Sequence, residues 1–273
     1  MICFFFCALL VWALPPQQVA EHPVALAADF DAAQCTECHA EKQQGKHVHS
    51  AMALGCTACH TVESKGETTR IGLMAPAGEI CLTCHELAKV EKDGVLHRPY
   101  EQKRCIVCHD PHSSEFTAQT RAPMNALCMA CHGERAKVGE SVELFAGQKL
   151  SGEEFNQIPK IGLDPTLKFG HPMGNHKVAD APNPLQPGEK ISCLTCHENH
   201  AATRAKLIRM TEYKGKKMDV CDACHLANDE ANMAEAQKRA DALEAQRQKE
   251  EQMRSKQPST MPQKPPRPKD KKP

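Results

Sequence analysis

The sequence predicts a mostly irregular chain with short α-helices, followed by a charged C-terminal helix and a disordered tail. Three observations support this fold class. Cysteine and histidine are abundant, with 16 and 15 copies in 273 residues, whereas aromatic residues make up only 4%. Prolines and glycines interrupt residues 64–192 too often for long elements, and strand signals are poor. Near the C-terminus the composition changes to Ala, Glu, Gln, Lys and Arg, which favour helix.

The composition leaves too few large side chains for an ordinary apolar core. Trp12 lies in the apolar segment at the N-terminus. A chain of this length normally buries a sizeable aliphatic and aromatic core. Something other than apolar side chains must therefore fill the interior. The aromatic residues after Trp12 are Phe30, Tyr100, Phe116, Phe145, Phe155, Phe169 and Tyr213.

Residues 1–27 are predicted to be a secretory signal. The apolar run from Ile2 to Leu14 is too short to span a bilayer. Small residues follow it, and cleavage after Ala20 or after Ala27 fits the usual pattern. The run lacks the usual basic beginning, and an uncleaved N-terminal anchor is the alternative. We expect an exported protein, periplasmic in the first instance, with an extracellular or membrane-associated location as the alternatives.

All fourteen cysteines after this signal fall in seven C-x-x-C-H pentads. Two thiols three positions apart can reach the two vinyl groups of one haem, while the next residue turns its imidazole onto the iron. The sequence thus predicts seven covalently attached haem c groups. The pentads, numbered one to seven in chain order, are Cys35-Cys38-His39, Cys56-Cys59-His60, Cys81-Cys84-His85, Cys105-Cys108-His109, Cys128-Cys131-His132, Cys193-Cys196-His197 and Cys221-Cys224-His225.

Zinc ligation, redox disulfides and structural bridges also use paired cysteines. None of them requires a histidine directly after the second cysteine in all seven copies. A thioredoxin-like motif would further need a strand–helix fold, which this chain does not predict. Haem attachment in an exported chain is therefore the favoured interpretation.

Eight histidines lie outside the pentads, and we set His22 aside because it is near or within the signal. The remaining seven match the seven irons in number. This match predicts bis-histidine, six-coordinate haem throughout, although Met52, Met124 or Met173 is an alternative ligand. Methionine more often fills gaps in a core. The predicted distal ligands are His47, His49, His97, His112, His171, His176 and His200.

The spacing of the pentads shows an internal repeat. Five pentads lie close together before a long insert at 133–192, and two follow it. CIVCHDPH (105–112) followed by CMACH (128–132) parallels CLTCHENH (193–200) followed by CDACH (221–225). In both copies a histidine, His112 or His200, stands three places after the pentad histidine. It is too close to ligate the same iron easily, so we expect it to cross to a neighbouring haem.

These segments resemble the doubled-CxxCH multihaem cytochromes c. The resemblance rests on HRP (97–99) ahead of CIVCHDPHSS, on GHPMGNH (170–176) ahead of ISCLTCHENH, and on the CxxCH that closes each copy. It covers about residues 35–225. It implies a chain of loops and short helices wrapped around closely stacked covalent haems, acting in periplasmic or extracellular electron transfer. The chain departs from it in two places: no histidine stands three places after His60, and the insert 133–192 is long. His47 and His49 are the available candidates for the distal ligands of the early haems.

The predicted organisation is a signal at 1–27, a heptahaem domain at 28–226 that contains the insert, a charged helix at 227–256 and a Pro/Lys-rich disordered tail at 257–273. The helix has only a thin apolar stripe through Met233, Ala236, Ala240 and Leu243, as expected for a solvated single helix. The tail has the composition of an extended, mobile segment. The bare chain has no net charge, but haem propionates would make the haem domain acidic beside this basic tail.

We expect an electron carrier rather than an enzyme, because saturated iron coordination leaves no position for a substrate. The alternative is a multihaem oxidoreductase with one open-coordinated haem, acting on a nitrogen or sulfur oxyanion. A variant pentad such as CxxCK often signals such a haem, and none is present. A structural subunit of a larger redox complex or filament would share the carrier chemistry. The expected partners are redox proteins, with a membrane-associated quinol-oxidising or an outer-membrane electron-transfer complex among the candidates, and no nucleic acid.

Overall fold

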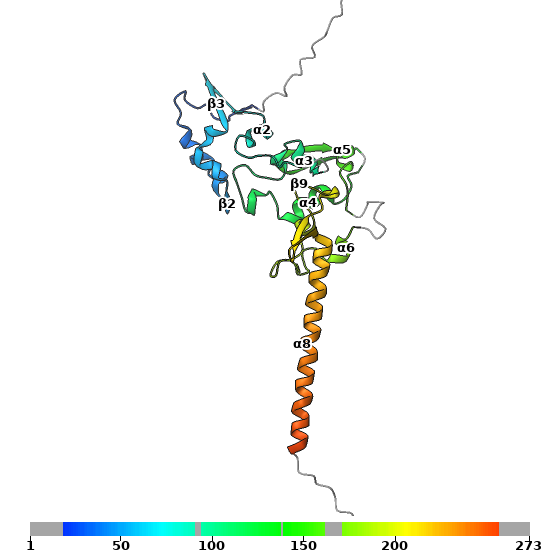
Figure 1. The fold of residues 1–273 in the computed structure, drawn as a ribbon. Coiled ribbons are helices and arrows are strands. Elements are labelled where there is room, and N and C mark those ends of the chain that lie inside the picture. Colours follow the sequence, from blue (N-terminus) through cyan, green and yellow to red (C-terminus); the bar gives the residue numbers. More distant parts are fainter. Residues whose placement is uncertain (1–18, 91–93, 138, 162–170, 257–273) are drawn as a thin grey trace, which may run out of the picture. The chain divides into compact units, whose positions relative to one another are not determined.

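The computed structural model describes residues 19–90, 94–137, 139–161 and 171–256. The chain divides into two units, Met1–Val220 and Cys221–Pro273, and each is treated by itself below. Residues 1–18 of the predicted signal, part of the insert and the predicted tail lie outside the described residues. The first unit consists of short helices and small sheets joined by loops (Figure 1). This architecture confirms the expected mostly irregular fold with short helices.

The helices of the first unit are short, and many of them coincide with a pentad. Proline begins several of them: Pro76 precedes α2, Pro123 precedes α4 and Pro172 precedes α6. Proline suits a helix start because its fixed φ is already helical and its missing N–H would have no partner there. The α-helices are α1 (Cys35–Cys38), α2 (Ala77–Cys81), α3 (Arg98–Glu101), α4 (Met124–His132), α5 (Gly152–Asn156), α6 (Met173–His176) and α7 (Cys193–Cys196). The 3₁₀ helices are η1 (Ala32–Gln34), η2 (Ala40–Gln43), η3 (Ser50–Leu54), η4 (Cys56–Ala58), η5 (Cys105–Val107), η6 (Thr117–Gln119), η7 (Phe145–Gly147) and η8 (Ala205–Leu207).

The strands form small antiparallel sheets. One sheet has three strands in the order β1-β4-β3, and the other described strands pair as β2-β6, β5-β9, β7-β8 and β10-β11. Their bounds are β1 (Ala20–Glu21), β2 (His47–Val48), β3 (His60–Lys65), β4 (Thr68–Leu73), β5 (Val95–Leu96), β6 (Ser113–Ser114), β7 (Ser141–Glu143), β8 (Lys149–Ser151), β9 (Ala201–Ala202), β10 (Met210–Tyr213) and β11 (Lys216–Asp219).

Two of the hairpins follow from their turn residues, although the strand signals are poor. Lys214 and Gly215 join β10 to β11 and both have positive φ, at 50° and 75°. Two consecutive positive φ values are typical of the type I′ turn, which matches the twist of a hairpin. Gly66, with φ 63°, opens the two-residue connection from β3 to β4. A glycine in that place allows the positive φ without steric strain.

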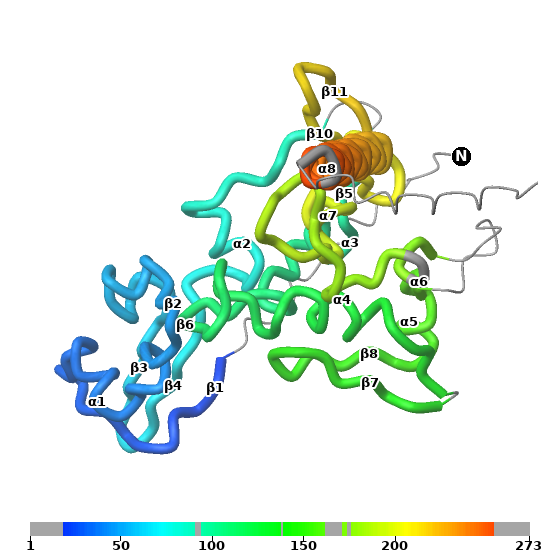
Figure 2. The backbone as a smooth tube through the Cα atoms, turned by 90° about the horizontal axis from the view of Figure 1, so that it is seen from below, coloured from blue at the N-terminus to red at the C-terminus, as the bar shows by residue number. Residues whose placement is uncertain are grey.

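Two further strand pairs join segments that are distant in the sequence. β2 pairs with β6, so that His47 lies opposite Ser114, and β5 pairs with β9, so that Leu96 lies opposite Ala201. The tube in Figure 2 shows β2 running beside β6. Each pair is only two residues long. These short pairs nevertheless matter, because histidines stand directly next to them.

The apolar core is small, as the composition predicts. Among the described residues, Phe155 is the only aromatic side chain in the buried apolar set, and it is 5% exposed. The set consists of Val107, Ala122, Phe155, Ile191, Ala202, Val220 and Ala223. Burial of so few side chains gives little of the apolar stabilisation that a domain of this size normally has. Groups attached at the pentads are the other candidates to fill the interior.

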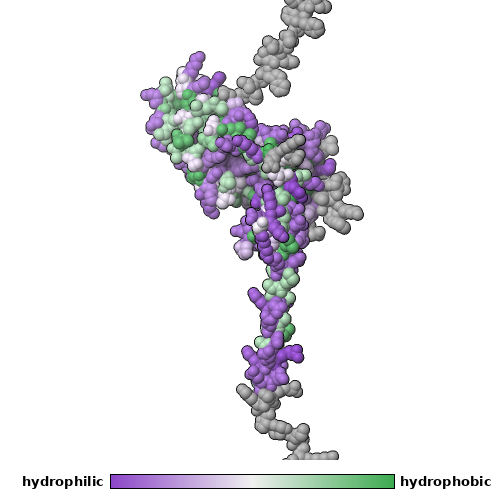
Figure 3. All heavy atoms as spheres, in the orientation of Figure 1, coloured by the Kyte–Doolittle hydropathy of each residue, from purple (hydrophilic) through white to green (hydrophobic). Residues whose placement is uncertain are grey.

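The second unit consists, in its described part, of a single helix. α8 (Val220–Lys256) begins before the seventh pentad rather than at the expected residue 227, so this pentad lies in its first turns. All side chains from 231 to 253 are exposed, and polar residues dominate the visible face of α8 (Figure 3). This exposure agrees with the expected solvated helix. Among the residues described, no helix combines the length and the apolar character that a membrane span requires.

Candidate haem-binding sites

Each pentad lies in a helical turn. In the first pentad the His39 N–H donates to the Cys35 carbonyl at 2.9 Å, and the third, fourth and sixth pentads have the equivalent bond at 3.0 Å. The fifth and seventh pentads lie within α4 and α8. Because residues three apart are neighbours on a helical surface, one turn brings both cysteines to the same side. None of the fourteen pentad cysteines forms a disulfide.

Six pentad histidines lie opposite another histidine ring, and in each case the partner comes from outside the pentads. The distance between the two ring centroids is nearly constant. The pairs are His22–His39 at 6.0 Å, His49–His85 at 5.9 Å, His60–His112 at 6.1 Å, His97–His132 at 6.1 Å, His109–His200 at 6.0 Å and His171–His197 at 6.0 Å.

This spacing fits two imidazoles that bind one metal from opposite sides. A metal–imidazole bond is about 2.0 Å and each ring nitrogen lies about 1.1 Å from its ring centre, so opposed ligands have centroids about 6 Å apart. Direct aromatic stacking would bring the rings closer. Among the described residues no group of three or more His, Cys, Asp or Glu converges as a metal site. Pairs of ligands are what a porphyrin iron requires, since the porphyrin supplies the four other nitrogens.

Hydrogen bonds at Nδ1 leave Nε2 available as the metal-binding atom. His109, His132 and His197 donate through Nδ1 to the carbonyls of Ala118, Pro159 and Lys206 at 2.8, 2.8 and 2.9 Å. The equivalent bond from His60 goes to Gly72 at 3.2 Å. Metal-ligating histidines almost always donate their other ring N–H in this way. His171 differs, because its Nδ1 accepts the Met173 N–H at 3.1 Å.

Burial also favours the neutral form of several histidines that lie outside the pentads, which we call the outer histidines. It is the leading cause that lowers the pKa of His97, His112, His171 and His200 below the usual value. For His97 and His171 the opposing pentad histidine lowers the pKa further. Only a neutral imidazole can bind a metal. The surroundings of these rings therefore fit a ligand role.

The fourth and sixth pentads lie in two copies of one backbone motif. We call Cys105–Arg121 the fourth-pentad module and Cys193–Arg209 the sixth-pentad module. The Asp110 N–H donates to Gln119 O at 2.7 Å in the first, and the Glu198 N–H donates to Leu207 O at 2.8 Å in the second. The backbone N–H of Arg121 donates to the Cys108 carbonyl, and that of Arg209 donates to the Cys196 carbonyl, both at 2.9 Å. Every matched bond is displaced by the same number of residues, which establishes the repeat structurally.

The short strand pairs place two outer histidines beside each module. The His49 N–H donates to the His112 carbonyl at 2.8 Å where β2 meets β6, and the His97 N–H donates to the His200 carbonyl at 2.8 Å where β5 meets β9. The His49 ring also donates to Pro111 O at 3.1 Å. In the first pair, His112 faces the second pentad and His49 the third. In the second pair, His200 faces the fourth pentad and His97 the fifth. The +3 histidines thus do lie opposite other pentads, namely the second for His112 and the fourth for His200.

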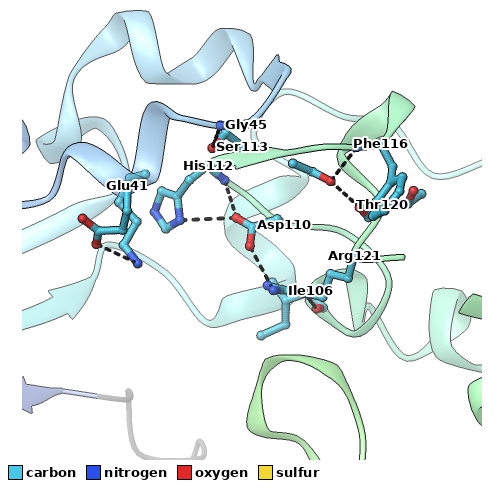
Figure 4. A network of polar contacts seen from close by, with 11 residues as sticks. Glu41, Gly45, Ile106, Asp110, His112, Ser113, Phe116, Thr120 and Arg121 are labelled. Carbon is cyan, nitrogen blue, oxygen red and sulfur yellow. Dashed lines mark hydrogen bonds and ion pairs between the residues drawn. The ribbon is translucent and has the colours of Figure 1, made fainter. Parts of the chain in front are cut away.

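A carboxylate stands next to His112 in the fourth-pentad module (Figure 4). Asp110 Oδ1 accepts the His112 N–H at 3.0 Å and lies 3.6 Å from Nδ1 of the ring. Asp110 Oδ2 accepts a hydrogen bond from Arg121 at 2.9 Å, and Arg121 Nε donates to Ile106 O at 2.7 Å. Arg121 thereby holds the carboxylate in place. The network fixes both the backbone and the electrostatic surroundings of the His112 ring.

The pentads of the first unit lie next to one another in chain order. Their first cysteines meet in three pairs: Cys35 with Cys56, Cys81 with Cys105, and Cys128 with Cys193. A hydrogen bond between the last two thiols raises the pKa of Cys128 and lowers that of Cys193. Element contacts agree with these pairs, since η1 touches η4, α2 touches η5 and α4 touches α7.

The second cysteine of a pentad connects one of these cysteine pairs to the next. Burial, then the neighbouring Cys105, raises the pKa of Cys81 to about 11, and Cys59 contributes to the same rise. Burial and then Cys131 raise the pKa of Cys108. Cys59 and Cys108 thus link the second pentad to the third and the fourth to the fifth. The six pentads of the first unit form a continuous row.

The structure brings together five of the seven predicted outer ligands and one that sequence reasoning missed. His49, His97, His112, His171 and His200 each face a pentad histidine, whereas the ligand roles of His47 and His176 stay predictions from the sequence. His22 faces His39 at 6.0 Å, although its position near the predicted cleavage site led us to set it aside. No local pattern identifies it, because its contact with His39 joins separate segments, as does that of His97 with His132 of the fifth pentad.

Pairs of histidines beside paired thiols define a class of protein that binds covalent haem. A family model for the doubled CXXCH motif matches residues 97–137 and 183–235. These segments contain the fourth and fifth pentads and the sixth and seventh, so the match confirms the resemblance there and indicates a multihaem c-type cytochrome. The first three pentads lie outside the matched segments. No curated protein and no solved structure matches the chain.

Proposed function

We propose that the protein is a heptahaem electron carrier whose haems have two histidine ligands each, acting in periplasmic or extracellular respiration. The constant spacing of the six histidine pairs is the observation that carries this proposal. A c-type haem supplies an iron that gains and loses one electron. The chain would attach each group through two thiols, and at six of the seven pentads a second imidazole stands opposite the pentad histidine, which would leave those irons no position for a substrate.

The order of the pentads supports movement of electrons along the chain. Consecutive pentads of the first unit adjoin one another through their cysteines, so each haem between the two ends of this row would have a neighbour on either side. Bis-histidine ligation favours a lower potential than the Met/His pairs of other cytochromes c. The row is therefore suited to pass electrons between low-potential donors and acceptors rather than to oxidise a substrate.

The cellular setting of the proposal rests on the predicted signal. Covalent haem and export would place the protein in the periplasm or outside the cell, where redox proteins act as donor and acceptor. A membrane-associated quinol-oxidising complex or an outer-membrane electron-transfer complex fits this role. The basic tail predicted at 257–273 would meet an acidic partner or an anionic membrane surface by charge attraction.

Electron paramagnetic resonance and carbon monoxide binding of the purified holoprotein test the coordination. If every iron has two histidine ligands, the ferric protein is entirely low-spin and the reduced protein binds little carbon monoxide at neutral pH. A high-spin haem that binds small ligands in the unaltered protein would contradict the proposal. The oxidoreductase interpretation would then become the better one.

His22→Ala distinguishes the ring geometry from the sequence count. The His22–His39 ring pair makes His22 the second axial ligand at the first pentad, so this variant should show one high-spin haem. The sequence count excludes His22 and predicts an unchanged spectrum. Glu21→Ala, one residue away, is the matched control and should stay low-spin, because the ring opposite His39 is untouched.

A further inference from the structure

The segment after the fifth pentad folds back over that pentad. His132 Nδ1 donates to Pro159 O at 2.8 Å, and the Ile161 N–H donates to His132 O at 2.8 Å. Asn156 closes the returning loop, because its side chain exchanges two 2.9 Å hydrogen bonds with the backbone of Ala136. Residues 159–161 are therefore fixed against the fifth pentad on its histidine side.

Lys160, in the middle of this contact, is the one buried charged side chain in the set of described residues, at 7% exposed. Its Nζ donates to Cys131 O at 2.5 Å and lies 3.3 Å from the centre of the Phe155 ring. Both contacts are those of a charged ammonium, since a cation is attracted by a ring face and by a carbonyl at a helix C-terminus. Within the described ranges no carboxylate lies at ion-pair distance from it.

The position of this charge matters because Cys131 is an attachment thiol and His132 the proximal ligand of the same haem. When iron(III) accepts one electron, the site gains one negative charge. A cation held nearby in a surrounding of low dielectric stabilises that reduced state. We propose that Lys160 raises the reduction potential of the haem at the fifth pentad above those of its neighbours in the row. This proposal rests on the proposed function.

Among the described residues, no other pentad has a buried cation without a carboxylate partner: Arg121 beside the fourth pentad is paired with Asp110, and Arg209 beside the sixth is paired with Glu198. The carbonyls that fix His60, His109 and His197 belong to Gly72, Ala118 and Lys206. The Lys206 side chain is the only charged one of these three. Its charge acts on His171, opposite His197, but it is exposed, so water screens it more than the buried Lys160. The fifth haem would thus be the most readily reduced of the row and would retain an electron arriving from the adjoining fourth or sixth haem. The first part of the insert, 133–161, acquires a function by supplying this charge.

The test compares Lys160→Gln and Lys160→Met with the unaltered holoprotein in an optical redox titration. Glutamine keeps a donor for Cys131 O without the charge, and methionine removes both. We expect one of the seven midpoint potentials to fall in both variants, with the others unchanged, seven haems by mass and a low-spin spectrum. Lys137→Gln is the control, because Lys137 is an exposed lysine of the same insert and should shift nothing.

Unchanged potentials in both variants with full haem content would overturn the proposal, as would a shift in Lys160→Met alone, which would assign the effect to the hydrogen bond. If both variants lose haem, Arg104→Gln replaces them. The Arg104 charge also acts on Cys131, and its removal should lower the same potential, whereas no shift would again overturn the proposal.

The affected haem can be identified in a His97→Ala background. Removal of the ring opposite His132 should make the fifth haem high-spin, so that its potential can be followed separately by its spectrum. Adding Lys160→Gln should lower the potential of that high-spin haem, and a fall confined to the low-spin haems would contradict the proposal. Absence of a high-spin haem in His97→Ala would instead disprove the ligand pair, while the seven-component titration would still test Lys160.

Discussion

The fourth-pentad and sixth-pentad modules have the same backbone and different side chains around their outer histidine. In both, matched main-chain hydrogen bonds fix the pentad, the turn with positive φ and the returning arginine. Beside His112 stands the Asp110 carboxylate, at 3.6 Å from Nδ1. Beside His200 lies the Tyr100 ring, with centroids 4.5 Å apart.

The length of the acidic side chain explains part of this difference. Asp110 is short enough to accept the His112 N–H at 3.0 Å and so stays next to the ring. Glu198, one methylene longer, extends to Arg209 at 3.4 Å. The backbone therefore decides where a ligand stands, and side chains at matched positions decide its electrostatic surroundings. Repeated modules can in this way hold haems of different potential.

The largest expected effect comes from removing the outer histidine of either module. His112→Ala should open the iron of the second pentad and His200→Ala that of the fourth, because these are the rings that they face. In each variant one haem in seven becomes high-spin and binds carbon monoxide, as measured by electron paramagnetic resonance and optical spectroscopy. Asn199→Ala, next to His200, is the control and should remain low-spin. One unchanged spectrum would break the equivalence of the modules as ligand carriers, and two would contradict both ligand pairs.

The acidic residues should separate the modules electrostatically. A carboxylate near Nδ1 of a ligating histidine stabilises the oxidised iron, so Asp110→Asn should raise one midpoint potential by tens of millivolts, where about 59 mV is a tenfold change for one electron. Glu198→Gln should change the potentials less, because both carboxylates contact an arginine but Asp110 also stands 3.6 Å from the ring of its outer histidine. The measurement is an optical redox titration of both holoproteins. Equal shifts in the two variants would show that the carboxylates act alike.

The smallest effect is expected for Tyr100→Phe. Phenylalanine keeps the ring over His200 but loses the hydroxyl that accepts the Ala88 N–H at 2.5 Å. The loss of one such bond should lower the free energy of unfolding by about 0.5–1.5 kcal/mol, measured by denaturant titration. The haem spectrum should not change. A high-spin haem in this variant would mean that the hydroxyl positions the ligand itself.

The pentads and their short helices could be predicted from sequence because both are local. The C-x-x-C-H spacing requires one helical turn, and glycine and proline limit how far each turn extends. The hairpin at Lys214 and Gly215 was missed because its strands carry charged residues rather than an alternating apolar pattern, and only the turn signals it.

The pairing of histidines could not be predicted, because it depends on contacts between distant segments. Nothing local indicates that His112 faces His60 rather than His85; the pairing of β2 with β6 decides it. A count of histidines predicts histidine as the second ligand, yet it omits His22, whose contact with His39 is a tertiary one.

Mass spectrometry of the denatured, exported holoprotein tests the central claim most directly. Seven pentads use all fourteen cysteines after the predicted signal, so the protein should carry seven haem masses and react with no thiol reagent. The same spectrum would show whether the chain begins after Ala20, which would leave His22 in the mature protein, or after Ala27. Fewer than seven haem masses, or any alkylated pentad thiol, would contradict the account.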